Sequence, residues 1–154
     1  MSPYRAAHPA GSAGVARIVF GPRTAYRTPA GRAQEDGQPG SLRPLVGHSL
    51  LNFDGMRPGM IVHIDAHIVE TWAEAYRPLD AHVLKSYADG PLAGEAAVVR
   101  QGNAVSIGAW SASLVTEVLT GVLAEAGIPV VPLPEGVRVS RRGALQISTR
   151  NRRN

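Results

Sequence analysis

Three side chains that can bind a divalent metal ion stand two residues apart near the middle of the chain. His63, Asp65 and His67 occupy positions i, i+2 and i+4. Successive side chains of a β-strand point to opposite faces, so on one strand these three would share a face. Imidazole and carboxylate groups are ligands for zinc and other divalent ions. The alternative is a polar strand face or strand end in water, because no further ligand cluster lies close in sequence.

Carboxylates are scattered along the chain, and a single pair of them has an aromatic neighbour. A glycosidase needs two carboxylates held across one glycosidic bond. Glu70 and Glu74 flank Trp72, and on a strand all three side chains would face the same way. The plainer interpretation is an exposed polar face that carries one aromatic residue.

Other catalytic signatures are absent from the sequence. The chain has no cysteine, which excludes disulfides, thiolate metal sites and a cysteine nucleophile. It has no Gly-x-Ser-x-Gly motif, and Gly90, Gly94 and Gly102 are too widely spaced for a phosphate-binding loop. We therefore assign no catalytic residue, no cofactor-binding residue and no metal ligand from the sequence, and we expect no cofactor.

The charge of the chain is unevenly distributed. The formal net charge is +4, but the basic residues gather at the two ends. Residues 1–40 carry five Arg and two acidic residues, residues 41–137 carry five basic and ten acidic residues, and residues 138–154 carry six Arg and no acidic residue. Basic flanks bind polyanions without specificity, and neither stacking aromatics nor a recognition helix accompanies them here. We expect no specific nucleic-acid partner.

The hydrophobic pattern gives no sign of a membrane protein. No run of about 18 apolar residues is present, so we expect no transmembrane helix. Arg17 interrupts the N-terminal stretch where a secretory signal would need apolar residues, so we expect a cytoplasmic protein. The 154 residues suffice for one domain, and its core must be aliphatic because aromatic residues make up only 5% of the chain.

One amphipathic helix is the clearest local element. Its apolar residues recur at helical spacing and form one wide stripe over residues 113–126. Ser111 or Ser113 could cap its N-terminus by accepting hydrogen bonds from free N–H groups. Gly127 suits the left-handed residue after its C-terminus. Gly121 lowers helix propensity, and we interpret it as allowing a close approach to a sheet.

Several short apolar runs predict strands around this helix. They cover residues 15–20, 60–64, 81–87, 96–99, 104–110, 137–140 and 144–148. Asp89-Gly90-Pro91 predicts a turn between two of them. Residues 68–76 are ambiguous, since their apolar residues fit a helix slightly better than a strand. Strands combined with one well-formed helix predict an α/β fold.

Five motifs between Trp72 and Arg142 occur in an order typical of one enzyme family. They are a Trp-x-Glu strand at Trp72-Ala73-Glu74, a strand at residues 81–87, a turn and strand at residues 89–98, a helix end at residues 125–128, and a segment at residues 134–142. In this order they resemble the C-terminal part of the bacterial β-galactosidases of glycoside hydrolase family 42. The resemblance covers about residues 41–142 and favours a strand for residues 68–76.

The resemblance implies a fold and a division of the chain. In such enzymes this region is the trimerisation domain, an α/β unit similar to class I glutamine amidotransferases and so flavodoxin-like. We expect residues 41–133 to be the second half of that domain. Residues 134–154 would begin the small C-terminal β domain and end in a basic tail. Residues 1–40 would be disordered or unrelated.

The resemblance also implies a role in assembly. The catalytic acid/base and nucleophile of these retaining glycosidases lie in a (β/α)₈ barrel, which requires about 200 residues or more and is not expected in this chain. We therefore expect a truncated, non-catalytic fragment that self-associates, as a homotrimer in the family. The alternatives are a small α/β binding module with a weak site at His63, Asp65 and His67, or a nucleic-acid binder with basic tails.

Overall fold

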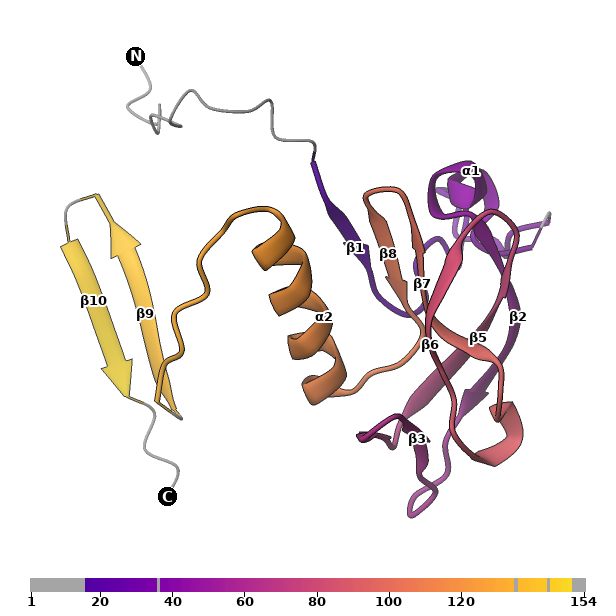
Figure 1. The fold of residues 1–154 in the computed structure, drawn as a ribbon. Coiled ribbons are helices and arrows are strands. Elements are labelled where there is room, and N and C mark those ends of the chain that lie inside the picture. The colour runs from indigo at the N-terminus through magenta and orange to yellow at the C-terminus, as the bar shows by residue number, and fades with distance from the viewer. Residues whose placement is uncertain (1–15, 36, 135, 144, 151–154) are drawn as a thin grey trace.

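A six-stranded sheet forms the centre of the computed structural model, which describes residues 16–35, 37–134, 136–143 and 145–150, without the side chains of residues 141, 142 and 145–150. Its strands follow the order β1-β8-β7-β5-β2, and β6 also pairs with β7 (Figure 1). The strands are β1 (Ile18–Phe20), β2 (His48–Gly55), β5 (Trp72–Pro78), β6 (His82–Ser86), β7 (Ala96–Gln101) and β8 (Ala104–Ile107).

The sheet is mixed, because one strand pair is parallel and the others are antiparallel. β1 runs parallel to β8, with Ile18 opposite Ala104. The pairs β2–β5, β5–β7, β6–β7 and β7–β8 are antiparallel. β2 carries an irregularity in register between Leu50 and Asn52. An α/β domain with a mixed sheet is therefore present, as the sequence predicts.

Helices and a small hairpin cover the sheet. The largest helix, α2 (Ala112–Glu125), follows β8, and the short α1 (Arg43–Val46) precedes β2. Two 3₁₀ turns lie at Gly40–Leu42 (η1) and Gly90–Leu92 (η2). A separate two-stranded hairpin consists of β3 (Val62–Ile64) and β4 (His67–Val69). Neither α-helix of the described residues has the length and apolar character needed to cross a bilayer.

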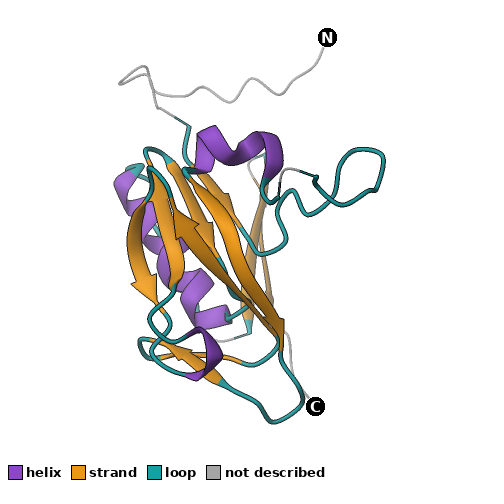
Figure 2. Ribbon diagram, turned by 90° about the vertical axis from the view of Figure 1, so that its right-hand side faces the viewer, coloured by secondary structure: helices purple, strands orange, loops and turns teal. Residues whose placement is uncertain are grey.

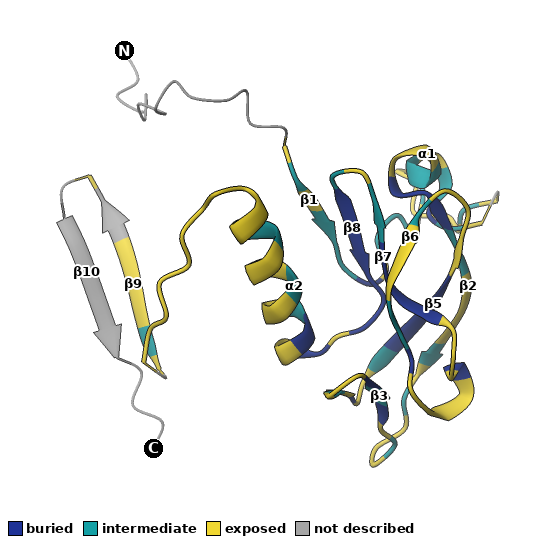
Figure 3. Cartoon of the chain, in the orientation of Figure 1, coloured by how far each residue is buried: buried dark blue, intermediate teal, exposed yellow. Residues whose placement is uncertain are grey.

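The main core lies between one face of the sheet and the layer formed by α2 and the β3–β4 hairpin. Val62 of β3, Val98 of β7 and Leu114 of α2 belong to one buried cluster. Leu114 is the only fully buried residue of α2, while Val118 and Val122 pack against the cluster with part of their surface exposed. Figure 3 shows most of the helix as exposed, with the buried position near its N-terminal end.

The segment between β1 and β2 covers part of the other face of the sheet. Phe20, Pro39 and Val46 approach Leu50 and Tyr76 of that face around a small cavity. Leu50 also donates its backbone N–H to the Gln38 carbonyl, 3.0 Å away. Part of this segment, between β1 and α1, projects from the body as a loop (Figure 2).

A second hairpin follows the main domain at the C-terminal end. β9 (Val137–Arg142) and β10 (Leu145–Arg150) pair antiparallel, with Val139 opposite Ser148. The two strands predicted at residues 137–140 and 144–148 are confirmed. Figure 1 shows this hairpin on the side of α2 away from the sheet. The last four residues of the predicted basic tail lie outside the described residues.

The structure confirms some of the predictions for individual segments and corrects others. Residues 67–69 and 72–78 form strands, so the helical periodicity of residues 68–76 is misleading and the strand suggested by the family resemblance is right. The helix predicted at residues 113–126 is confirmed within one residue. The sheet includes β1, so it begins well before the predicted boundary at residue 41. Residues 1–15, for which we expected disorder or an unrelated segment, lie outside the described residues.

Two details of the helix differ from the prediction. Ser111 occupies the N-cap position, but its side chain makes no capping hydrogen bond; its Oγ lies 3.3 Å from Ser113 Oγ instead. Gly121 does not bring the helix close to the sheet, since a Cβ at this position would meet no atom within 4 Å. It borders an open groove of about 250 Å³ between α2 and the sheet.

Backbones approach each other closely at Gly108, directly after β8. Its N–H donates to the Ala97 carbonyl at 2.8 Å, and its carbonyl accepts the Glu74 N–H at 2.6 Å. The buried Tyr87 hydroxyl donates to the carbonyls of both Glu74 and Gly108, at 3.1 and 3.2 Å. A Cβ at Gly108 would overlap the Glu74 carbonyl oxygen and lie 3.0 Å from that of Ala97. The chain directly after β8 therefore reaches both β5 and β7 only because residue 108 is glycine.

Two glycine substitutions are expected to change stability in opposite directions. Gly108→Ala should lower the free energy of unfolding by about 1–3 kcal/mol, because the methyl group forces backbone atoms apart. Gly121→Ala should raise it by about 0.5–1 kcal/mol, because alanine favours the helix and the position is open. Urea unfolding followed by circular dichroism measures both. A Gly108→Ala protein as stable as wild type would contradict the close packing described for β8.

Candidate functional site

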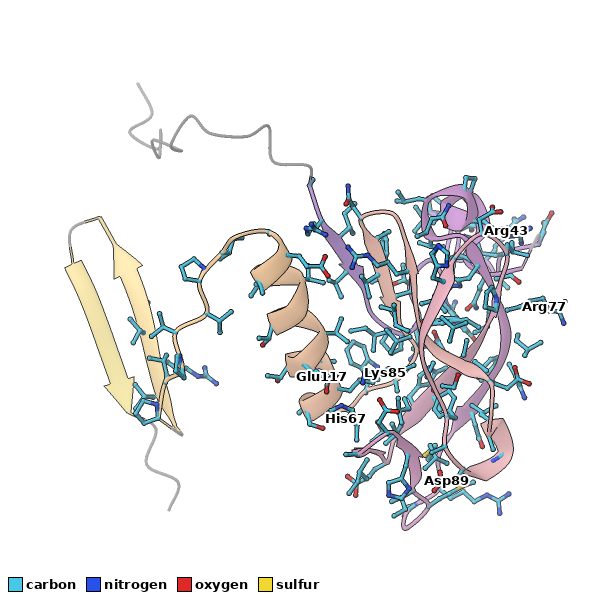
Figure 4. All side chains as sticks on the ribbon, viewed as in Figure 1. Arg43, His67, Arg77, Lys85, Asp89 and Glu117 are labelled. Atoms are coloured by element: carbon cyan, nitrogen blue, oxygen red, sulfur yellow. The ribbon has the colours of Figure 1, made fainter. Side chains whose placement is uncertain are left out.

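The three residues predicted as a possible metal site point to three different partners. His63 binds Asp89 through its Nδ1 and its backbone N–H, each at 2.7 Å from the carboxylate. Asp65 binds Lys85, with 2.5 Å between the carboxylate and Nζ. His67 is discussed with the network below. Figure 4 shows His67 and Lys85 near Glu117, and Asp89 well apart from them.

The prediction of a shared face is wrong because the segment is not one strand. β3 ends at Ile64 and β4 begins at His67, with Asp65 in the turn between them at a φ of 52°. The turn breaks the two-residue alternation on which the prediction depended. Within the residues that the structure describes, no group of three His, Asp or Glu side chains could hold a metal ion.

A polar network connects α2 to the β3–β4 hairpin and β6. Lys85 Nζ lies 2.5 Å from Asp65 and 2.8 Å from Glu117. His67 contacts Ser113 Oγ at 2.9 Å through Nδ1 and Glu117 at 2.7 Å through Nε2. The hydrogen bonds from Lys85 and then His67 lower the pKa of the Glu117 carboxyl. The network is a tether between elements far apart in sequence, and each of its charged groups is paired.

A second ionic contact holds the other end of α2. Arg100 of β7 makes a bidentate pair with the Glu125 carboxylate, at 2.8 and 2.6 Å. Arg17, just before β1, also reaches Glu125 at 2.6 Å. The hydrogen bond from Arg100 lowers the pKa of the Glu125 carboxyl. Ion pairs therefore link both ends of the helix to the sheet, in addition to the packing of Leu114, Val118 and Val122 on the core.

The most buried carboxylate in the described residues is Glu74, with only 4% of its surface exposed. It lies on β5 beside Trp72, whose Nε1 donates to Glu74 Oε1 at 2.9 Å. The backbone N–H of Arg23 donates to the same oxygen at 2.8 Å, and the Tyr76 hydroxyl is 3.4 Å from Oε2. Glu74 thus fastens the segment after β1 to the sheet.

The expectation for the Glu70–Trp72–Glu74 group is only partly right. Glu74 and Trp72 do share a face of β5, as alternation on a strand requires. Glu70 precedes the strand and is exposed, and Glu74 is buried rather than part of an exposed polar face. The two carboxylates are therefore in different environments.

Burial shifts the pKa values of Glu74 and His48 in opposite directions. Loss of solvation raises the pKa of the Glu74 carboxyl, and hydrogen bonds from Trp72 and Arg23 offset this in part. His48, also 4% exposed, stacks against Tyr76 with 4.1 Å between ring centroids and contacts Ser106 Oγ at 2.9 Å through Nε2. Burial lowers the pKa of His48 to about 4. Near neutral pH this histidine is uncharged.

A cavity of about 20 Å³ lies between Glu74, His48, Ser106 and the segment that follows β1. A cavity of that size has room for about one water molecule. It is far smaller than the several hundred Å³ typical of sites for sugars or cofactors. The polar groups around it therefore hold the fold together and do not form a substrate site.

An aromatic cluster lies on the surface next to Glu74. Phe53 of β2 stacks on Trp72, with 5.2 Å between ring centroids and an angle of 17°. Tyr26 meets Phe53 edge to face at 6.5 Å. The Arg23 guanidinium lies 5.2 Å from the centroid of the Trp72 ring and 5.1 Å from that of Tyr26. We call Arg23, Tyr26, Phe53 and Trp72 the aromatic patch.

Sequence reasoning missed the partners of this region. His48, Tyr26 and Phe53 lie in segments without a clear period, so nothing marked them as neighbours of Trp72. The Trp-x-Glu spacing was the one available signal, because alternation on a strand puts both side chains on one face. It identified Glu74 but not its burial.

Taken together, these features define a class of protein. An α/β domain with a mixed sheet contains ion pairs that link its elements, a cavity with room for about one water molecule and a partly exposed aromatic patch, and its described residues include no group of three side chains that could hold a metal ion. These contacts define a packed α/β domain with a mixed sheet.

The family follows from comparison with known proteins. Residues 12–129 match the family model described as the β-galactosidase trimerisation domain, and the chain belongs to this family, a part of the glycoside hydrolase family 42 β-galactosidases of carbohydrate metabolism. It is 30% identical over 134 residues to a β-galactosidase of Thermus thermophilus, covering 82% of this chain and 20% of that enzyme. The chain thus spans about a fifth of the length of the curated relatives it matches.

Solved structures agree with this assignment. A β-galactosidase from the Antarctic haloarchaeon Halorubrum lacusprofundi has a TM-score of 0.76 and 30% identity, over 87% of this chain and 22% of that one. A β-galactosidase from the psychrophilic Marinomonas has a TM-score of 0.74 over 86% of this chain and 20% of that chain, and its 23% identity makes it evidence for the fold alone. The six-stranded mixed sheet therefore belongs to a known domain type, and the catalytic barrel is absent from these 154 residues.

Replacing Glu74 is expected to change how stability depends on pH. Because the folded protein raises the pKa of Glu74, it keeps this proton where the unfolded chain has lost it. The contribution is fully present below the ordinary value of 4.5 and is lost as pH rises through the raised pKa. The unfolding free energy of wild type minus that of Glu74→Gln should therefore fall as pH rises above 4.5.

Urea unfolding of both proteins at a series of pH values measures this difference. His48 acts with the opposite sign, since its lowered pKa removes stability as pH falls, but it is present in both proteins and cancels. Glu70→Gln, at an exposed position outside β5, is the matched control and should follow wild type. A wild-type minus Glu74→Gln difference that is constant with pH would contradict the burial of a titrating carboxylate.

Proposed function

We propose that this chain is an assembly module of a β-galactosidase and does not hydrolyse galactosides by itself. The observation that carries the proposal is the match of residues 12–129 to the trimerisation domain family. The polypeptide would contribute subunit contacts, and the bond-breaking chemistry would lie in a separate catalytic domain of the enzyme type that it resembles.

The chemistry of glycosidases supports the division of roles. Two carboxylates must flank the scissile bond, about 5–10 Å apart depending on the stereochemical outcome. One carboxylate oxygen of the buried Glu74 accepts hydrogen bonds from Trp72 and from the Arg23 backbone. The cavity beside Glu74 has a volume of only about 20 Å³. Asp65, Asp89, Glu117 and Glu125 are each bound to basic partners.

We also propose that the domain is part of a larger sheet of the class I glutamine amidotransferase type. The parallel pairing of β1 with β8 supports this, as does α2 on one face of the sheet. The antiparallel strands β2, β5, β6 and β7 depart from a purely parallel flavodoxin-like sheet. The amidotransferase likeness would be architectural only, because the chemistry of that enzyme class requires a cysteine and this chain has none.

The partner implied by this function is another copy of the same chain, in a homotrimer like that named by the family. A closed three-fold ring uses heterologous contacts, in which one surface of each copy meets a different surface of the next. A cytoplasmic location remains part of the proposal, since it rests on the sequence alone.

Sedimentation velocity of the purified chain is expected to show a trimer. Because mass action governs assembly, the trimer fraction should rise with protein concentration and fall on dilution. Measurement over a wide concentration range gives the association constant. A chain that remains monomeric at the highest soluble concentration would contradict the assembly role.

The same protein is expected to leave a chromogenic β-galactoside unhydrolysed. Glycosidase catalysis needs the paired carboxylates described above, and Glu74, Glu117 and Glu125 are engaged in contacts that hold the fold. A matched preparation of Glu74→Gln controls for contaminating enzyme. Turnover that purifies with the wild-type chain and is lost in Glu74→Gln would overturn the non-catalytic assignment.

A further inference from the structure

We propose that Ser113, His67 and Glu117 form a hydrolytic site for small acyl esters, with Ser113 as the nucleophile. The three side chains form one chain of hydrogen bonds. Ser113 Oγ lies 2.9 Å from His67 Nδ1, and His67 Nε2 lies 2.7 Å from Glu117 Oε2. A nucleophile within hydrogen-bond reach of a base, which a third group orients in turn, is the arrangement that covalent hydrolases use. This activity lies beyond the assembly role proposed above and does not depend on it.

The contact with Glu117 fixes which nitrogen of His67 can act as a base. Hydrogen bonds from Lys85 and then His67 lower the pKa of the Glu117 carboxyl, so near neutral pH this group is a carboxylate and only accepts hydrogen bonds. The single proton of a neutral His67 ring is therefore on Nε2. Nδ1 keeps its lone pair and can accept the hydroxyl proton of Ser113, as a general base must.

Lys85 orients the carboxylate that orients the histidine. Its Nζ lies 2.8 Å from Glu117 Oε1, whereas His67 binds Oε2, so the two contacts use different oxygens. Lys85 also pairs with Asp65, and the two carboxylates together carry one more charge than the lysine. This excess negative charge favours the imidazolium that His67 becomes when it takes the serine proton. Figure 4 shows Lys85 and His67 near Glu117 of α2.

The start of α2 offers donors for the oxyanion of a tetrahedral intermediate. Ser113 is in the first turn of the helix, which begins at Ala112. The first N–H groups of a helix have no partner within it, and Ser111 at the N-cap makes no side-chain hydrogen bond to them. These N–H groups and the positive end of the helix dipole are next to the nucleophile, where negative charge develops during acyl transfer.

The nucleophile is open to solvent, whereas its base is shielded. Ser113 is exposed, so an ester can reach Oγ without a change in the fold. The His67 side chain is only 11% exposed, and water therefore competes less for its two hydrogen bonds. An exposed serine accepts an acyl group without enclosing it, so we expect small esters with good leaving groups as substrates.

The reaction would proceed in two steps. Ser113 Oγ bonds to the ester carbonyl carbon while its proton moves to His67 Nδ1. The bond from that carbon to the leaving oxygen then breaks, and the alcohol departs with the proton, which leaves an acyl ester on Ser113. Water attacks the same carbon, gives a proton to His67 Nδ1 and releases the carboxylic acid, as the proton returns to Ser113 Oγ. The net reaction converts ester and water to acid and alcohol.

Hydrolysis of p-nitrophenyl acetate by wild type and three variants tests the proposal. Ser113→Ala should lower the rate at least about a hundredfold, since positioned acid–base groups contribute this much or more. His67→Gln should lose the same activity, because glutamine cannot take up the proton. Thr116→Ala is the matched control. It removes an exposed hydroxyl of the same helix that donates to the Ala112 carbonyl at 2.7 Å, and it should hydrolyse the ester like wild type. Circular dichroism confirms that each variant is folded.

Labelling of the unaltered chain gives a second test, in case a variant fails to fold. A fluorophosphonate transfers its phosphonyl group to an activated serine and releases fluoride. Peptide mass spectrometry should place one phosphonyl group on Ser113. Unfolding the chain in urea before the probe is added should abolish this labelling, because activation depends on the contact with His67.

The outcomes separate a hydrolytic site from a structural contact with the same hydrogen bonds. Ser113→Ala with the ester hydrolysis of wild type would overturn the proposal. A fluorophosphonate that labels other residues, or none, would overturn it as well. Hydrolysis that is lost in Ser113→Ala and His67→Gln but kept in Thr116→Ala supports it. Each result can arise in a monomer or a trimer, so the assembly function is tested separately.

Discussion

The close crossing of backbones at Gly108 is the constraint on which the rest of the domain depends. This residue joins β5 and β7 through hydrogen bonds to Glu74 and Ala97, and the Tyr87 hydroxyl donates to the carbonyls of Glu74 and Gly108. Buried backbone groups must find partners, so this arrangement leaves little freedom for the strands around it. It sets where β5 lies, and β5 carries both Trp72 and Glu74. The positions of Trp72 and Glu74 thus depend on a backbone contact at Gly108, a residue without a side chain.

Charge and apolar packing have separate roles around this crossing. The apolar cluster of valines, alanines and Leu114 fixes one face of the sheet, and the buried Glu74 holds the covering segment on the other. Helix α2 is held both by apolar packing and by charge, since Leu114 is its only fully buried residue and ion pairs act at both of its ends. Exposed pairs of this kind each add little to stability, and their value here is in orientation. Because the core contains few large side chains, the domain depends on many small contacts, each of which has a specific geometry.

The sequence predicts the elements better than the contacts between them. The amphipathic stripe and Gly127 locate α2 almost to the residue, and alternating apolar runs locate β6, β7 and β8. For residues 68–76 the period is misleading, because Ile68, Trp72 and Tyr76 suit either a helix or a strand. The sequence predicts a strand at Asp65, because none of the residues beside it indicates a turn with a positive φ. Glu74 and His48 could not be recognised as buried, since burial depends on a segment that is distant in sequence.

The parallel pairing of β1 with β8 has a consequence for how the chain acquires its structure. Ile18 lies opposite Ala104, so the pair closes a loop that includes most of the domain. Closing such a long loop costs conformational entropy before the paired strands gain any contact. Long-range pairings therefore slow folding. During synthesis the first strand leaves the ribosome long before its partner exists. β1 stays unpaired until β8 is available in the β7–β8 hairpin. The segment between β1 and β2 can pack against the sheet only after β1 has paired.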